Sequence, residues 1–454
     1  MNDLAIPPQS IEAEQSVLGG LMLDITTFGA VQAVVSVQDF YRQDHQIIFN
    51  AVSQLVAEGS PVDILTLNDY LERKGLVDKA GGFAYFAAIA KNTPSAANVV
   101  AYADIVREKS LLRTIIAVGK EMVQAAMDGE GAGSKSIISA AENKIFELAQ
   151  QGLRGKRGFV PLKQVLVGVV DQMERDYEEP PETGVLGVPS GFCDLDNMTS
   201  GLEGGDLVIV AARPSQGKTS LVMNIAEHVA VKQNLPVAVF SMEMATDQIA
   251  RRLIASNGGV SLKHVREAWK IQENDWPLIS TALQQLGPCP MFIDDSPALT
   301  ISGIRSRAMR LVAQIGDEHP EGLGLIVIDY IQLMSSDNLS AANRNVEIEE
   351  ITRGLKQLAK ELSVPVVALS QLNRNLESRP NKRPVMSDLR ESGAIEQDAD
   401  LIMFIYRDEV YNPESSDTGI AEVIIGKNRN GPLGTVRLAF QAEQTRFRGL
   451  SNGY

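Results

Sequence analysis

Apolar residues recur at three- and four-residue spacing almost throughout the first 130 residues. The pattern predicts helices over residues 11–23, 46–55, 64–72 and 98–113, with Ser10 as the N-cap of the first. No alternating run of strand type appears there. His45 stands alone in a helical stretch, and we interpret it as a structural histidine. The pattern therefore predicts an all-α N-terminal domain without a catalytic cluster.

Two further helices, residues 111–127 and 135–150, flank a glycine-rich segment at 128–134 and are typical of an antiparallel helical hairpin. Polar segments rich in Gly and Pro follow at 154–158 and 178–184. Between them a single helix begins at Pro161, and its apolar residues share one stripe: Leu162, Val165, Leu166, Val169, Val170 and Met173. We expect the stripe to dock on a neighbouring copy of the chain, the alternative being its own domain.

From Pro189 onward, apolar runs of strand length alternate with helical patterns, which is typical of a mostly parallel sheet. We predict strands at 207–211, 237–241, 291–294, 325–329, 364–370 and 401–406, and a terminal hairpin of 422–426 with 435–440. The fold class is therefore multidomain, an all-α N-terminal domain followed by an α/β domain. The expected division is a helical domain at 1–152, a linker with the docking helix at 153–184 and the α/β domain at 185–454.

The loop after the first of these strands carries the strongest chemical signal in the chain. Residues 212–219 read Ala-x-x-x-x-Gly-Lys-Thr, one residue away from the phosphate-loop pattern, and they join a strand to a helix as that pattern requires. Loop amides and the helix N-terminus can bind phosphate oxygens, Lys218 adds a charge, and the Thr219 hydroxyl suits Mg²⁺. We expect a nucleoside triphosphate site, although Ala212 stands where glycine is usual.

Three polar residues at strand ends are candidates for the same site. Asp329 ends a long aliphatic run and is our choice for the second magnesium contact over the competing pair Asp294 and Asp295. Glu243 follows the strand after the phosphate-loop helix, so we expect it to be the general base. Gln371 ends another strand and is a candidate sensor of the γ-phosphate.

Cations gather in two later segments. Residues 373–390 hold five Lys or Arg against two acidic residues, so the local charge is 5 − 2 = +3; the choice between phosphodiester contact and a solvated loop stays open on charge alone. Lys427 and Arg429 occupy the turn of the terminal hairpin, a position from which Arg429 could act as an arginine finger in a neighbouring subunit.

Composition narrows the class of protein. The chain has 454 residues, 44% hydrophobic and 22% charged, with a formal charge of −15 and two distant cysteines. These values exclude a disulfide framework, a Cys-x-x-Cys zinc site and a simple basic nucleic-acid coat. We found no signal peptide and no apolar run of membrane-spanning length, so we expect a cytoplasmic protein without a membrane partner.

Six motifs in order resemble the DnaB-like family of bacterial replicative helicases, and a seventh near the N-terminus extends the likeness over nearly the whole chain. They are Ala-Arg-Pro-Ser-Gln-Gly-Lys-Thr-Ser220, Phe240-Ser-Met-Glu-Met244, Ile326-Val-Ile-Asp-Tyr-Ile-Gln-Leu333, Ala368-Leu-Ser-Gln-Leu-Asn-Arg374, the segment 387–400, Gly426-Lys-Asn-Arg-Asn-Gly-Pro432, and the N-terminal segment 7–20. The departures from the family pattern at Gln216 and Met242 remove no functional group.

The resemblance implies a homohexameric ring with RecA-like motors that uses ATP and Mg²⁺ to move 5′ to 3′ on single-stranded DNA. It implies primase binding through the N-terminal domain and a helicase loader. Matched residues would be Ser215, Gly217, Lys218, Thr219 and Ser220 on the phosphates, Glu243 in catalysis, Lys427 and Arg429 across the interface, Arg252 (or Arg251) on the base, and Arg390, Glu391 and Gly393 on DNA.

Two other classes share part of this pattern. A recombinase or clock ATPase of the RecA type would have the phosphate loop and the glutamate, but the helical N-terminal half and the Arg-Glu-Ser-Gly segment at 390–393 disfavour both. A scaffold that holds a structural nucleotide would not need Glu243, Asp329 and Arg429 in addition to the loop. We therefore expect an ATP-dependent DNA helicase.

Overall fold

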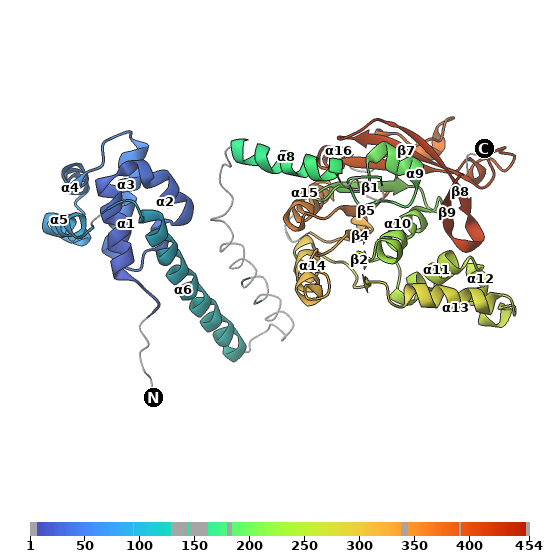
Figure 1. Ribbon diagram of the computed structural model, residues 1–454, viewed down its shortest axis with the longest axis horizontal. Coiled ribbons are helices and arrows are strands. Elements are labelled where there is room, and N and C mark those ends of the chain that lie inside the picture. The colour runs from blue at the N-terminus through green and yellow to red at the C-terminus, as the bar shows by residue number, and fades with distance from the viewer. Residues whose placement is uncertain are drawn as a thin grey trace. The chain divides into compact units, whose positions relative to one another are not determined.

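The computed structural model describes residues 7–93, 95–128, 141, 144, 162–178, 184–336, 344–389 and 392–450 (Figure 1). The chain forms two compact units, Met1–Val170 and Asp171–Tyr454, whose border falls inside one helix. The finer division at residues 152 and 184 stays a prediction.

The first unit is helical, as the apolar spacing predicts. Its helices are α1 (Ile11–Leu23), α2 (Phe28–Val34), α3 (Gln43–Ala57), α4 (Ile64–Arg73), α5 (Gly82–Asn92) and α6 (Val99–Asp128). The Ser10 side chain caps α1 by accepting a hydrogen bond from the Ala13 amide. His45 is fully buried, with Nδ1 2.6 Å from Glu14 and Nε2 2.7 Å from the Tyr85 hydroxyl, so it links α1, α3 and α5 as a structural histidine.

Helix α6 differs from the prediction because it is one helix of 30 residues rather than two. The windows 98–113 and 111–127 overlap, and no proline interrupts the segment, so nothing in the sequence ends a helix there. The second helix of the predicted hairpin, 135–150, lies outside the described residues apart from Ala141 and Lys144, and Lys144 pairs with Glu121 of α6.

Helix α8 (Leu162–Glu178) is the single helix that the sequence predicts between the two polar segments. Its apolar stripe is exposed: Leu162 is 69% accessible, Leu166 51% and Met173 64%.

Within the described ranges, no single helix is long and apolar enough to cross a membrane, although α1 and the residues 25–34 reach the required length and composition as a pair bent by 116°.

The second unit is built on one sheet with the strand order β3-β2-β4-β5-β1-β6-β7-β8-β9. Strands β1 (Leu207–Ala212), β2 (Val237–Ser241), β3 (Met291–Asp294), β4 (Leu325–Asp329), β5 (Val366–Gln371) and β6 (Leu401–Tyr406) pair in parallel. Strands β7 (Ile420–Asn428), β8 (Gly434–Gln441) and β9 (Arg446–Gly449) extend the sheet in antiparallel pairing. The prediction missed β9, which has only four residues and follows Thr445 in a left-handed conformation.

Helices cover both faces of this sheet because alternate residues of each strand face opposite sides. Val208 and Val210 of β1 pack in the cluster that holds residues of α9 (Cys193–Thr199), α10 (Lys218–Lys232) and α11 (Thr246–Gly258). Leu207 and Ile209 pack instead with α14 (Ile301–Ile315), α15 (Arg344–Leu362) and α16 (Ser392–Asp398). The smaller helices α12 (Leu262–Arg266) and α13 (Asp275–Leu286) follow α11 along the chain.

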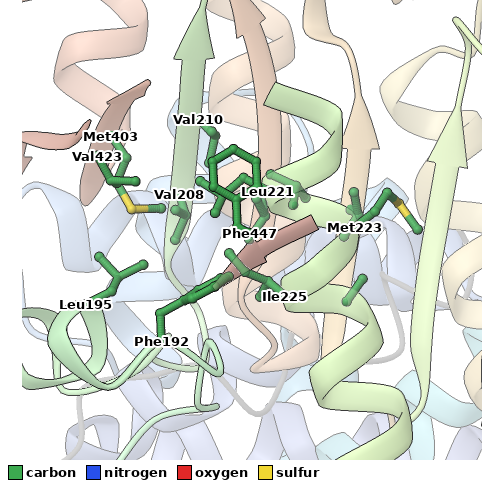
Figure 2. Close-up of a cluster of buried hydrophobic side chains, with 14 of the residues drawn as sticks. Phe192, Leu195, Val208, Val210, Leu221, Met223, Ile225, Met403, Val423 and Phe447 are labelled. Carbon is green, nitrogen blue, oxygen red and sulfur yellow. The ribbon is translucent and has the colours of Figure 1, made fainter. Parts of the chain in front are cut away.

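Figure 2 shows part of the first cluster, with Val208, Val210, Leu221, Ile225 and Phe447 labelled. Strand β1, helix α10 and strand β9 thus share one core. The loop that joins β1 to α10 is anchored at both ends in this packing, so its position is fixed by the core.

We expect Leu369→Ala to destabilise the second unit by about 2–5 kcal/mol, because Leu369 of β5 is fully buried in the first cluster and its truncation leaves a cavity. Leu433→Ala is the matched control: Leu433 is 62% exposed, and its truncation should change stability by less than about 0.5 kcal/mol. Urea unfolding followed by circular dichroism measures both. Equal effects of the two variants would contradict this assignment of the core.

Candidate nucleotide site

The loop between β1 and α10 has the backbone that phosphate binding requires. Ser215 has φ +67° and Gly217 has φ +98°, both left-handed, and α10 begins directly afterwards at Lys218. A Cβ on Gly217 would lie 3.0 Å from Cζ of Phe447, so both conformation and space favour glycine there. The loop thus directs its amides and the N-terminus of a 15-residue helix toward one point.

A cavity of about 520 Å³ opens over this loop. Its walls come from the carboxyl ends of β1, β2, β5 and β6 and from the start of α10, where ligands gather in open parallel sheets. The lining residues are Ala212, Arg213, Pro214, Ser215, Gly217, Lys218, Thr219, Ser220, Glu243, Met244, Arg252, Gln371, Arg407, Phe440, Ala442 and Thr445.

Asp329 lies at the end of β4, beside the first turn of α10. Its Oδ2 accepts a hydrogen bond from the Thr219 hydroxyl at 2.9 Å, and its Oδ1 is 3.9 Å from Nζ of Lys218. Burial raises the pKa of Asp329, and the same desolvation lowers the pKa of Lys218. Oδ1 is buried and accepts no hydrogen bond from any residue in the described ranges, so the Lys218 ammonium is its only ion-pair partner there.

The competing carboxylates have other partners. Asp294 pairs with Arg307, and Asp295 accepts a hydrogen bond from the Thr246 amide at 3.0 Å. The geometry therefore agrees with the choice of Asp329 as the carboxylate beside the phosphate loop.

Glu243 and Gln371 reach the cavity from two other strands. Glu243 follows β2 by two residues and is exposed, which leaves its carboxylate open to the cavity. Gln371 is the last residue of β5. Its backbone N–H donates to Oε1 of Gln332, and the side-chain Nε2 of Gln332 donates to the hydroxyl of Ser370. The structure brings both residues to the loop, as the strand-end argument predicts.

Arg251 and Arg252 point in different directions from α11. Arg251 pairs with Asp247 of the same helix, whereas Arg252 lines the cavity. Burial lowers the pKa of the Arg252 guanidinium, and Asp329 and Glu243 oppose that shift by their charge. Of the two alternatives that the sequence leaves open, Arg252 has the geometry to reach a nucleotide bound in this cavity.

The two hairpin cations are bound elsewhere in their own chain. Arg429 donates to Oδ1 of Asp400 at 3.0 Å and to the carbonyl of Gln397 at 2.8 Å, and Lys427 donates to the carbonyl of Glu396 at 2.5 Å. Neither residue is among those that line the cavity in the described part of the chain. A role in nucleotide chemistry therefore requires the cavity of another copy.

The predicted DNA-contacting residues are less fully covered. Arg390 and Glu391 lie outside the described residues, while Gly393 is exposed in α16 with open space around its Cα. Within the basic segment before them, Arg379 pairs with Asp388 and Arg383 with Glu422, so part of its charge is already matched.

Sequence reasoning missed Arg407, Phe440 and Thr445, which also line the cavity. Arg407 directly follows β6, so the strand-end argument that found Glu243 and Gln371 would have found it too. Phe440 and Thr445 come from the antiparallel extension, and no motif marks them.

Comparison with known proteins now adds to this geometry. Residues 187–449 match the family model of the DnaB-like helicase C terminal domain, and residues 6–108 match that of the DnaB-like helicase N terminal domain. The replicative DNA helicase DnaB of Pasteurella multocida (strain Pm70) is 46% identical over 98% of this chain and 94% of its own length. The replicative DNA helicase DnaC of Bacillus subtilis (strain 168) is 42% identical over 100% of this chain and 97% of its own.

A solved structure gives the same result for the whole fold. A DnaB-like replicative helicase, described together with its interactions with primase, superposes with a TM-score of 0.75 at 31% identity and covers 97% of this chain and 100% of its own. The match therefore spans both the helical unit and the α/β unit of this chain. The chain belongs to the DnaB-like family of replicative DNA helicases, which are ATP-dependent enzymes of DNA replication.

Proposed function

We propose that six copies of this chain form a ring that hydrolyses ATP, moves 5′ to 3′ on single-stranded DNA and separates the duplex at a replication fork. The observation that carries the proposal is the convergence of Lys218, Thr219, Glu243 and Gln371 on one cavity at the carboxyl ends of parallel strands, where Thr219 also donates a hydrogen bond to Asp329. Each side chain comes from a different strand end or from the helix start, so chance placement is a poor explanation.

The loop residues Ser215, Gly217, Lys218 and Ser220 would bind the phosphates, and Arg252 would pack on the base. The Thr219 hydroxyl would bind Mg²⁺ directly and Asp329, its hydrogen-bond partner, would hold the ion through a water, which suits an ion that keeps several waters and prefers substrate phosphates. No group of three or more His, Cys, Asp or Glu that could hold a metal occurs among the described residues. When bound, the ion neutralises charge on the phosphates.

Glu243 is our general base. Its exposed carboxylate faces the cavity and can orient an attacking water and accept its proton. Gln371 would contact the γ-phosphate. The backbone N–H of Gln371 donates to the side chain of Gln332, which lies just after β4. The ends of β5 and of β4, the strand that carries Asp329, would therefore respond to the same ligand.

The finger residues support a ring. Because Arg429 and Lys427 are held at the carbonyl end of α16 and away from their own cavity, we assign them to the cavity of the next subunit. Helix α16 begins just after Arg390 and Glu391, which we assign with Gly393 to the DNA backbone. One seven-residue helix thus joins the proposed DNA contact to the proposed finger.

Further partners follow from the family and from exposed surface. The related helicase structure is described with its interactions with primase, and we assign primase binding to the N-terminal domain of this chain by that similarity. We also infer from the family resemblance that a helicase loader protein binds this chain.

The exposed apolar stripe of α8 suits docking on a neighbouring copy, where the exposed Trp276 and Leu283 of α13 offer an apolar surface.

A fork-unwinding assay tests the proposal. With ATP and Mg²⁺, the full chain should displace a strand from a fork with a 5′ tail and leave one with only a 3′ tail intact. Light scattering of the same sample should give the mass of six chains. Unwinding from the 3′ tail, or a monomer that unwinds at full rate, would contradict the proposal.

We expect Glu243→Gln to keep nucleotide binding and to lower kcat for ATP by at least about 100-fold, because the amide cannot accept the proton from water. Isothermal titration with ADP and a phosphate-release assay measure the two quantities. Unchanged hydrolysis would remove Glu243 from the role of base.

Mixing of subunits tests the shared site. Arg429→Ala and Lys218→Ala should each lose ATPase activity by about 1,000-fold or more, and a 1:1 mixture should regain roughly a quarter of wild-type activity, since intact loops then meet intact fingers at about that share of interfaces. The control is a mixture of Lys218→Ala with Glu243→Gln, which damages the same side of every interface and should stay inactive. If the first mixture stays inactive too, Arg429 does not act in a neighbouring subunit.

A further inference from the structure

Arg407 contacts the phosphate loop, although the two are 192 residues apart in the sequence at the Ser215 contact. It is 9% exposed and follows β6, the strand beside β1. Its Nη1 donates to the carbonyl oxygen of Ser215 at 3.1 Å, and its Nε donates to Oε1 of Glu409 at 3.0 Å. Its guanidinium carbon lies 4.2 Å from the centre of the Phe440 ring. The side chain is thus fixed on three sides.

The next loop residue is bound to Arg407 as well. The backbone N–H of Arg407 donates to Oε1 of Gln216 at 2.7 Å, and Gln216 is 1% exposed. Two consecutive residues of the phosphate loop are therefore held by one residue, Ser215 through its main chain and Gln216 through its side chain.

This support acts where the loop backbone costs free energy. Ser215 has φ +67°, a left-handed conformation that is unfavourable for a residue with a Cβ. Such a conformation persists only where neighbouring groups hold it. The charged hydrogen bond from Arg407 to the Ser215 carbonyl is such a group, and it fixes the peptide that leads into the Gln216 and Gly217 amides.

The anchor itself is rigid. Oε2 of Glu409 accepts a hydrogen bond from the Gly419 amide at 2.8 Å, just before β7. Phe440 of β8 packs against Phe447 of β9 with ring centres 4.6 Å apart, and Phe447 lies beneath Gly217. The antiparallel extension of the sheet therefore supports the loop directly through Phe447, and indirectly through Phe440, which contacts Arg407.

We propose that Arg407 is a positioning residue for nucleotide binding: with Gln216 it holds the phosphate loop in its binding shape before the nucleotide arrives. This proposal rests on the nucleotide site of the proposed function. It differs from direct contact with a phosphate, since the guanidinium acts on the loop carbonyl. A loop shaped in advance contributes equally to ground-state and transition-state binding, so its loss should raise KM more than it lowers kcat.

The test uses the full chain and a fluorescent ADP derivative, mant-ADP, whose affinity is measured by titration. Arg407→Gln should weaken binding by about 10- to 100-fold, the range expected for a charged hydrogen bond of this kind. Arg407→Lys should weaken it nearly as much, because one ammonium cannot span both Ser215 and Glu409. In steady-state ATP hydrolysis, both variants should raise KM and keep kcat within about threefold of wild type.

Gln216→Met isolates the second arm. It keeps an unbranched side chain of similar length in a buried place and removes the acceptor, so affinity should fall by about 3- to 10-fold. This variant also keeps the test informative if the Arg407 variants fail to fold, because it leaves the buried guanidinium of Arg407 and its ion pair with Glu409 in place. Arg437→Gln is the control. Arg437 lies on β8 and forms an exposed ion pair with Asp417, so this variant should bind mant-ADP like wild type.

Full affinity in Arg407→Lys would assign Arg407 to direct charge contact and overturn the proposal, as would unchanged affinity in Gln216→Met. A fall in kcat at unchanged KM would place Arg407 in the chemical step and overturn it as well. The proposed function fails separately, if the wild-type chain itself binds no mant-ADP. Light scattering of each variant keeps assembly out of the comparison.

Discussion

The parallel pairing of β1 with β5 and β6 is the constraint on which the rest of the second unit depends. The register sets Ala212 opposite Gln371, and it sets Ala211 opposite Phe404, three residues before Arg407. Because parallel strands end at the same edge, this pairing brings the phosphate loop, Gln371 and Arg407 to one edge of the sheet before any side chain contributes. The cavity is a consequence of backbone geometry, and the side chains add chemistry to it.

Electrostatics then shape what the cavity accepts. Lys218 and Arg252 bring positive charge near the buried carboxylate of Asp329, while Glu243 adds a second acidic group in the open part. Burial opposes the charge on both Lys218 and Asp329, so each of the two groups is stabilised by the opposite charge beside it. On the proposed function, a ligand that brings phosphates and a divalent cation would supply both groups with a partner of opposite charge.

Much of this arrangement follows from the sequence because its causes are local. Long aliphatic runs fixed the strands that hold Asp329 and Gln371, and the spacing of Gly217 and Lys218 fixed the loop. Other features depend on tertiary contact and have no local signal. The difference between Arg251 and Arg252 arises from which face of α11 meets the sheet, and β9 forms because Phe447 finds a core position beneath Gly217. Arg407 belongs to an intermediate case, since its strand was predicted but its partners on the loop were not.

Asp400 shows how the two ends of β1 serve different sites. Its Oδ2 accepts a hydrogen bond from the Leu207 amide at the start of β1 and pairs with Lys356 of α15, while its Oδ1 holds Arg429. At the other end of the same strand stands the phosphate loop. On the proposed arrangement, one strand therefore carries the loop of its own site at its carboxyl end and supports the finger of the next site at its amino end. Because a six-residue strand in a packed core deforms little, a shift that a nucleotide imposed on the loop would on this arrangement reach the finger of the same chain through β1.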